Sequence, residues 1–161
     1  MSLDDLYREL ILDHFKSPRN HGKLKDADIE MEGVNPLSGD ELTLTVSVES
    51  GGHIAQVQAV SRGCSISQAS TSMMTEALTG LTLAEADALV AAFKRMMLAD
   101  GTAAGLPEAL EELGALEGVK QYPVRIKCAL LAWNTWLEGV QSYRAQNPTD
   151  HHKVVTSHKE T

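Results

Sequence analysis

The sequence predicts an α+β fold, because helical and strand periodicities occupy separate stretches of the chain. Apolar residues recur at helical spacing near the N-terminus, alternate with polar residues in the next third, and return to helical spacing afterwards. Strands grouped together and followed by helices are typical of α+β domains with a small antiparallel sheet. At 161 residues the chain fits one domain. We expect that domain to span residues 1–145, followed by a disordered polar tail over residues 146–161.

The first expected helix ends near Phe15. Asp4 and Asp5 favour its start, because carboxylates stabilise the positive end of the helix dipole. Pro18 and Gly22 then open a loop. The residues at helical spacing are Leu3, Leu6, Tyr7, Leu10 and Ile11.

An antiparallel hairpin is expected next. Between Leu42 and Val48, apolar residues alternate with threonine and serine, which is the pattern of a half-buried strand. Ser50, Gly51 and Gly52 predict the turn, and a second strand is expected over residues 54–61.

Two capped helices follow the hairpin. Ser65 with Gln68, and Thr82 with Glu85, have the spacing of capping boxes, and Gly80 ends the first helix. Methionines recur at helical spacing in both helices, which favours core packing over a cofactor site. They are Met73, Met74, Met96 and Met97.

The remaining chain predicts two more helices. A loop over residues 101–105 leads to Pro107, which suits the first turn of a short helix ending near Gly114. The last helix is expected from Pro123 to Tyr143. Its apolar stripe consists of Ile126, Leu130, Trp133 and Leu137.

Composition excludes several classes of function. The formal net charge of −8 argues against general nucleic-acid binding and would suit a basic surface on a protein partner. No stretch has the length and apolarity of a membrane span, and the N-terminus lacks the pattern of a signal peptide. Two cysteines without a secretory context indicate reduced thiols in the cytoplasm.

Both cysteines occupy places that favour a thiolate. Cys64 lies between a strand end and a helix start, where the helix dipole stabilises an anion. Cys128 lies within the last helix, three positions after Arg125 and so on the same face. Asp40 follows Gly39, which allows a sharp turn that presents the carboxylate from a loop. A metal or thiol site built from these residues is one hypothesis.

The alternative hypothesis is purely structural. A single cysteine is most often a small buried apolar residue, and an aspartate after glycine most often belongs to a turn. Two cysteines and an aspartate also lack the dense spacing of a zinc finger. Spacing alone therefore gives a weak signal.

Three longer motifs strengthen the metal hypothesis. They are Asp13–Asn20, Gly63–Met74 and Tyr122–Trp133, and together with Leu6–Arg8 they extend over most of the chain as far as Leu137. In these motifs the chain resembles the U-type iron–sulfur cluster assembly proteins, and most of all their SufU branch. The stretch between Gly80 and Tyr122 resembles the insertion of that branch. Lys127 stands where the IscU branch has a histidine ligand, which also favours SufU.

The resemblance implies a fold and a function. Family members have a small antiparallel sheet packed on helices, with a long C-terminal helix, and they are accessory proteins rather than enzymes. The resemblance implies zinc bound by Asp40, Cys64 and Cys128, or a transient iron–sulfur cluster, with Arg125 in support. It implies a SufS-type cysteine desulfurase as the sulfur donor and the Suf assembly machinery downstream. The acidic net charge and the lack of a membrane span separately predict no nucleic acid or membrane as partner.

Ser38 departs from the family pattern. Family members have cysteine at this position of the Asn-Pro-x-Cys-Gly-Asp motif, and the resemblance implies that this cysteine is both a ligand and the sulfur acceptor. A neutral hydroxyl is a poor zinc ligand and forms no persulfide. Asp40, Cys64, Cys128 and a water still make a tetrahedral zinc site, whereas a stable cluster usually needs four cysteines.

Two further functions compete with a zinc-dependent sulfur-transfer or scaffold protein. One is a metal-free, degenerate adaptor that only docks on the desulfurase. The other is an enzyme with Cys64 as nucleophile, which needs a base that no matched segment supplies. His14 is expected to pack in the core rather than to bind metal, and the tail histidines are expected to be solvated. The latter are His151, His152 and His158.

Overall fold

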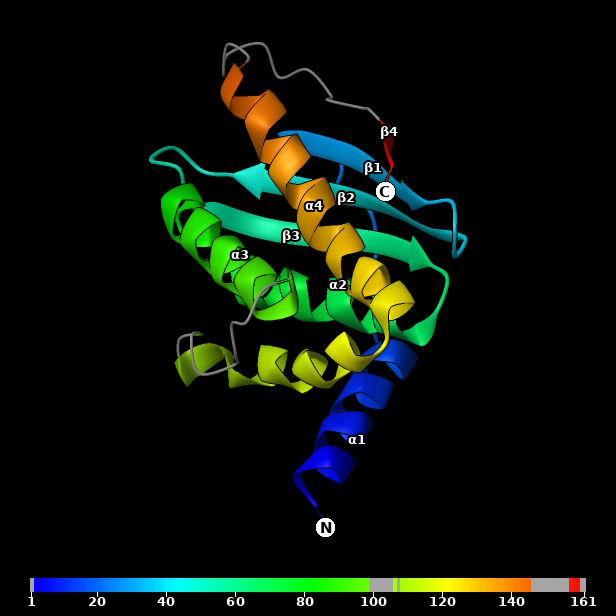
Figure 1. The fold of residues 1–161 in the computed structure, drawn as a ribbon. Helices are drawn as coiled ribbons and strands as arrows, with labels where there is room; N and C mark the ends of the chain where they lie inside the picture. Colours follow the sequence, from blue (N-terminus) through cyan, green and yellow to red (C-terminus); the bar gives the residue numbers. More distant parts are fainter. Residues whose placement is uncertain (1, 99–105, 107, 146–156, 160–161) are drawn as a thin grey trace.

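The structure is a computed structural model that describes residues 2–98, 106, 108–145 and 157–159. In chain order its elements are α1 Leu3–Lys16, β1 Ile29–Asn35, β2 Asp40–Val48, β3 Ile54–Arg62, α2 Ser65–Leu78, α3 Leu83–Leu98, the 3₁₀ helix η2 Glu108–Gln121, α4 Pro123–Ala145 and β4 Ser157–Lys159 (Figure 1). The expected α+β class is confirmed, including the small antiparallel sheet and the long C-terminal helix.

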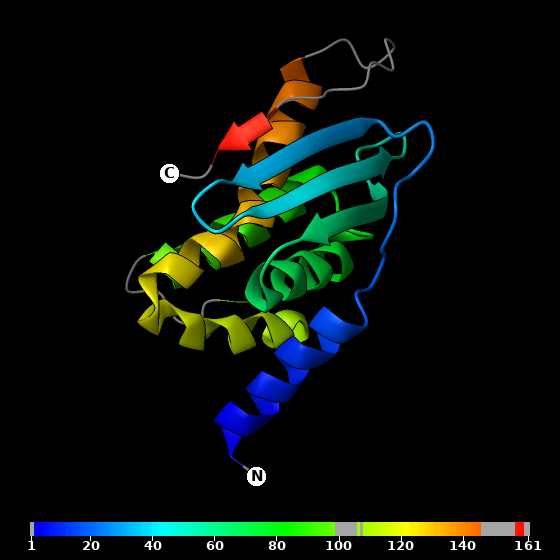
Figure 2. The ribbon, with the colours of Figure 1, turned by 90° about the vertical axis from the view of Figure 1, so that its right-hand side faces the viewer.

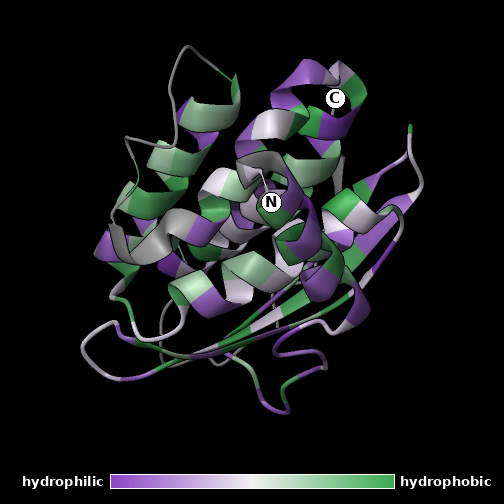
Figure 3. Cartoon of the chain, turned by 90° about the horizontal axis from the view of Figure 1, so that it is seen from below, coloured by the Kyte–Doolittle hydropathy of each residue, from purple (hydrophilic) through white to green (hydrophobic). Residues whose placement is uncertain are grey.

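The sheet has the strand order β3-β2-β1-β4, and the helices lie on one of its faces (Figures 2 and 3). The first three strands are antiparallel, while β4 pairs in parallel with β1. Helices α2 and α4 pack directly on this sheet, and α3 packs against α4. Helix α1 lies at one end of the molecule, against α2 and η2.

The core forms between the sheet and the helices. Phe93 of α3 stacks on Trp133 of α4, with ring centroids 4.1 Å apart and an interplanar angle of 15°. All four methionines expected in the core are buried, as the helical spacing indicated. None of the described helices has the length and apolarity needed to cross a membrane.

The helix starts follow the sequence with one correction. Thr82 and Glu85 form the expected capping box, since each side chain accepts a hydrogen bond from the other residue's backbone N–H. At the start of α2 the N-cap is Cys64 rather than Ser65. The side chain of Gln68 reaches back to the carbonyl of Gly63 at 2.8 Å instead.

Three segments differ from the expectations. Strand β1 was not expected, and it lies in the sheet between β2 and β4. The helix expected to end near Gly114 continues as η2 to Gln121. Residues 157–159 form β4 rather than disordered tail, while the rest of the expected tail, the 101–105 loop and Pro107 lie outside the described residues.

Candidate metal centre

Asp40 reaches the centre through the tight turn that joins β1 to β2. The carbonyl of Asn35 accepts hydrogen bonds from the backbone N–H groups of Ser38 and Gly39. Gly39 has φ +77°, a left-handed conformation that glycine adopts without steric cost, as the sequence indicated. Asp40 is the first residue of β2, so the expectation of a loop position is wrong, and the residue is fully buried.

Cys64 reaches the centre at the junction of β3 and α2. As N-cap it has extended backbone angles, φ −71° and ψ 162°, and its Sγ accepts a hydrogen bond from the Ser67 N–H at 3.5 Å. The positive end of the helix dipole faces this sulfur. The preceding Gly63 has φ +126°, and a Cβ there would lie 2.8 Å from the Cα of Asp40. Only glycine fits this approach between the two loops.

Cys128 is contributed by the second turn of α4 and is 1% exposed. Helices α2 and α4 are fastened together by the buried Ser70, which donates to the carbonyl of Ala129 at 2.6 Å. The same hydroxyl accepts from the indole N–H of Trp133 at 2.9 Å. These two hydrogen bonds of the Ser70 hydroxyl fix how α2 and α4, the helices that carry the cysteines, lie along one another.

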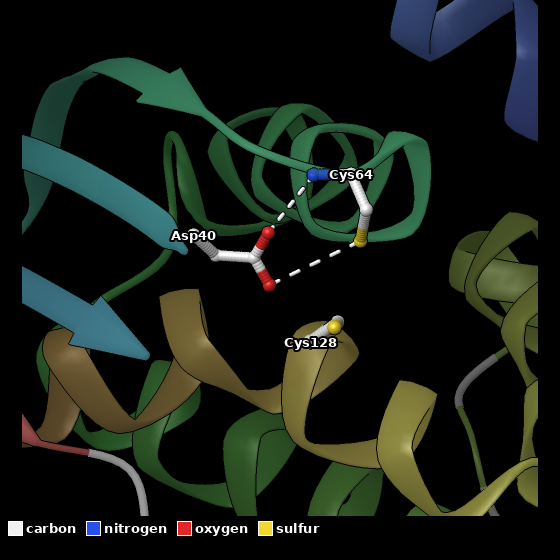
Figure 4. A group of neighbouring side chains, drawn as sticks. All are labelled: Asp40, Cys64 and Cys128. Atoms are coloured by element: carbon white, nitrogen blue, oxygen red, sulfur yellow. Dashed lines mark hydrogen bonds between the residues drawn. The ribbon is translucent and has the colours of Figure 1, made fainter. Parts of the chain in front are cut away.

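The three side chains converge on one point (Figure 4). The Sγ atoms of Cys64 and Cys128 and a carboxylate oxygen of Asp40 all lie within 4.8 Å of one another. Oδ1 of Asp40 accepts from the backbone N–H of Cys64 at 2.9 Å, and Oδ2 lies 3.9 Å from its Sγ. The structure thus brings together the three residues predicted as ligands.

Ser38 lies beside the carboxylate, as its place in the turn requires. Its hydroxyl donates a hydrogen bond to Oδ2 of Asp40 at 2.6 Å. Both carboxylate oxygens therefore have donors without a metal. A metal at this centre would be held by the Asp40 carboxylate in competition with these donors.

The protonation of Cys128 differs from the expectation. Its pKa is raised to about 12, by burial first and then by the neighbouring Asp40 and Cys64, against the opposing effect of Ser38. A thiolate at Cys128, which we expected from the nearby Arg125, is therefore disfavoured in the metal-free protein. The guanidinium is exposed at the surface, and Cys64 is the largest cause that raises the pKa of Arg125. Arg125 therefore interacts more strongly with Cys64 than with Cys128.

The donor set suits zinc. Thiolate sulfur and carboxylate oxygen are both common zinc ligands, and zinc prefers tetrahedral sites. Neighbouring ligand atoms in such sites are roughly 3.3–3.8 Å apart, so the separations of up to 4.8 Å would shorten slightly on binding. Asp40, Cys64 and Cys128 would hold the ion, which would supply Lewis acidity and keep both sulfurs as thiolates.

Histidines take no part in this centre, because the group within 4.8 Å contains none among the described residues. His14 is 0% exposed, which confirms that it packs in the core. His21 is exposed. His151 and His152 lie outside the described residues, and of His158 only the backbone is described.

The structure contains a second group of possible metal ligands that was not predicted from the sequence. His14 of α1, Glu76 of α2 and Glu112 of η2 have ligand atoms within 4.8 Å of one another. Nothing in the sequence indicated that Glu112 would join them.

Comparison with known proteins identifies the class of this chain. The NifU-like N-terminal domain family matches residues 6–150. The chain therefore belongs to that family.

Similar proteins agree with this assignment. The chain is 39% identical over 146 residues to the zinc-dependent sulfurtransferase SufU of Bacillus subtilis, covering 91% of this chain and 97% of the relative. It is 38% identical over 149 residues to the iron–sulfur cluster assembly scaffold protein IscU of Streptococcus pyogenes serotype M1, covering 92% and 91%. A crystal structure of a SufU from Fervidobacterium islandicum superposes with a TM-score of 0.74 at 35% identity, covering 86% and 99%.

Proposed function

We propose that this chain is a zinc-binding, SufU-like protein of iron–sulfur cluster assembly, which works in the cytoplasm with a cysteine desulfurase. The observation that carries the proposal is the convergence of Asp40, Cys64 and Cys128 from three separate elements. Family membership and the likeness to a zinc-dependent sulfurtransferase support zinc as the ion. The protein acts as an accessory to the desulfurase rather than as an enzyme of its own.

The surface beside the centre suits a protein partner. Leu37, Tyr122 and Val124 are 75%, 61% and 66% exposed. Tyr122 and Val124 also line an open groove between α1, η2 and the starts of α2 and α4. Apolar side chains exposed around a functional site are typical of docking surfaces. The desulfurase would dock here, close to Cys64.

Sulfur transfer is the step that Ser38 affects. A thiolate attacks the outer sulfur of a persulfide, which leaves the desulfurase cysteine as a thiolate and carries the sulfur to the acceptor. A serine hydroxyl does not perform this reaction. We therefore propose that the chain binds the desulfurase but accepts sulfur weakly, through Cys64 or Cys128 if at all.

A metal-free adaptor is the second candidate function. It is favoured by one observation, the hydrogen bonds from Ser38 and Cys64 that already satisfy both oxygens of Asp40. In that case the chain would keep the docking surface and lose the ion.

Metal content separates these two candidates. Full-length protein purified without chelators should contain zinc by mass spectrometry, and Cys64→Ala should lower the zinc content by up to one equivalent. Cys64→Ala should lower the melting temperature of the zinc-loaded protein, because an ion that binds only the folded state stabilises it. Absence of zinc and iron, combined with desulfurase binding in a pull-down, would establish the adaptor and refute zinc binding.

A further inference from the structure

His14 lies at the junction of α1, α2 and η2, and one nitrogen of its imidazole ring is buried without a hydrogen-bond partner among the described residues. Its side chain is 1% exposed, and Nδ1 lies 2.8 Å from the hydroxyl of Ser72. Nε2 is buried and has no hydrogen-bond partner among the described residues. Figure 1 shows the three elements meeting below the sheet, far along the chain from one another.

Two carboxylates face this nitrogen. Oε1 of Glu76 and Oε2 of Glu112 each lie 3.7 Å from Nε2, too far for a hydrogen bond. Glu76 is 46% exposed and Glu112 is 62% exposed, so both side chains can move closer and one side of the group is open to water.

The hydrogen bonds of Ser72 suit a ligand histidine. Its hydroxyl oxygen accepts from the backbone N–H of Arg19 at 2.8 Å and has a second lone pair for the Nδ1–H of His14. A metal-binding histidine usually donates its other ring N–H to such an acceptor. In the tautomer that carries its proton on Nδ1, Nε2 presents a lone pair to two carboxylates, an arrangement that repels unless a cation lies between them.

The charges around the group are unbalanced in favour of a cation. Asp13, Glu76 and Glu112 supply negative charge, and Arg19, which is paired with Asp13, supplies the nearby positive charge. Three carboxylates against one guanidinium leave a deficit of two positive charges around a neutral imidazole.

We propose that His14, Glu76 and Glu112 form a second metal site, which binds a divalent transition ion such as zinc and ties α1 and η2 to α2. One imidazole nitrogen and two carboxylate oxygens are ligands that zinc, iron and manganese accept. Water would complete the coordination on the open side. The site shares no residue with the cysteine centre, so it stands whether or not that centre binds zinc.

The test uses full-length protein in which other candidate ligands are removed. The background carries Cys64→Ser and Cys128→Ser, together with His151→Gln, His152→Gln and His158→Gln. Isothermal titration with zinc should show one equivalent bound. Glu76→Gln and Glu112→Gln should each weaken binding about tenfold or more, whereas Glu9→Gln, which removes an exposed carboxylate elsewhere on α1, should change it less than about twofold.

A structural signal accompanies the titration. Zinc should shift the imidazole resonances of His14 and leave those of the exposed His21 unchanged. Absence of zinc binding in this background, or equal affinity in the Glu76→Gln, Glu112→Gln and Glu9→Gln variants, would overturn the proposal. Both glutamates are exposed, so their substitution tests the site even if His14→Gln fails to fold.

Discussion

At the scale of single residues, Asp40 is the point on which the candidate centre depends. Its carboxylate contacts Ser38 from its own turn and Cys64 from the next loop. Gly63 makes this approach possible, because any side chain there would occupy the place of the Asp40 carboxylate.

Gly63→Ala should therefore disrupt the centre as well as strain the backbone. We expect a loss of roughly 2–4 kcal/mol in the free energy of unfolding, from positive φ and from displacement of Asp40. Zinc affinity should fall with it. Urea denaturation and zinc titration measure both effects.

Gly52→Ala is the matched control. Gly52 also has positive φ, +82°, but a Cβ there would meet no atom within 4 Å. It should cost only the backbone strain and leave zinc affinity unchanged. Equal losses of unfolding free energy and of zinc affinity in the two variants would show that the close approach to Asp40 is not the reason for glycine at position 63.

Ser38→Cys should restore sulfur acceptance. The new thiol would lie beside Asp40 and could attack a desulfurase persulfide, which an alcohol does not do. Stimulation of a desulfurase from the same source should rise sharply, while binding affinity stays within a few-fold. Ser38→Ala controls for loss of the hydrogen bond to Asp40. If the unaltered chain already stimulates fully and Ser38→Cys adds nothing, Cys64 or Cys128 is the acceptor.

At the scale of elements, long patterns could be predicted and local exceptions could not. Strands β2 and β3 and the capping box at Thr82 followed from local rules. Strand β1 did not, because its alternation of apolar and polar residues covers only residues 29–32 before Gly33 interrupts the apolar face. Glu30 is buried beside Lys23, at 3.3 Å, and Gly33 admits the close approach of Thr135 on α4.

The full length of η2 was not predicted from the sequence, again because local residues gave a misleading pattern. Gly114 and Gly118 were compatible with a helix end, but the chain continues through both. Leu113, Leu116 and Val119 are buried at intervals of three residues, which is the repeat of a 3₁₀ helix. That short repeat is hard to distinguish from an α-helical one in sequence.

His14 makes the packing of α1 sensitive to pH. Burial lowers its pKa below the ordinary 6.5, and Arg19 acts in the same direction, against the opposing effects of Glu76 and Glu112. The folded protein thus binds fewer protons than the unfolded chain in this range. Stability from His14 is fully present above pH 6.5 and is lost as pH falls through the lowered pKa.

His14→Gln should therefore flatten the acid side of the stability profile. We expect the variant to be less stable than the unaltered protein at pH 7.5, with the difference shrinking towards pH 5. Thermal melts in chelator across this range measure it. The exposed His21→Gln should keep the original profile. A difference that stays constant with pH would mean that His14 contributes through packing alone.

At the scale of the whole molecule, the candidate metal centre depends on how distant segments pack together. Asp40, Cys64 and Cys128 are separated by 24 and 64 positions, so their spacing does not indicate a common site. They were predicted as ligands because they lie in motifs that resemble those of the family. Their convergence depends on the sheet register and on the α2–α4 contact. The raised pKa of Cys128 depends on burial and on its neighbours, which spacing along α4 does not show.

The cysteine count limits cluster chemistry. The whole chain has two cysteines, and clusters are usually held by four. Anaerobic reconstitution with iron and sulfide should therefore give little stable visible absorption, whereas Ser38→Cys should increase it. A two-iron cluster at near-full occupancy in the unaltered protein would return the chain to the scaffold class.

The ligand set of bound zinc tests the central claim most directly. X-ray absorption at the zinc edge, on full-length protein loaded with one equivalent, reads the number of sulfur ligands. We expect two sulfurs at about 2.3 Å and two lighter ligands at about 2.0–2.1 Å, from Cys64, Cys128, Asp40 and water. Cys64→Ser should reduce the sulfur count to one. Zinc surrounded only by nitrogen and oxygen would contradict the claim that the cysteine centre is the primary zinc site.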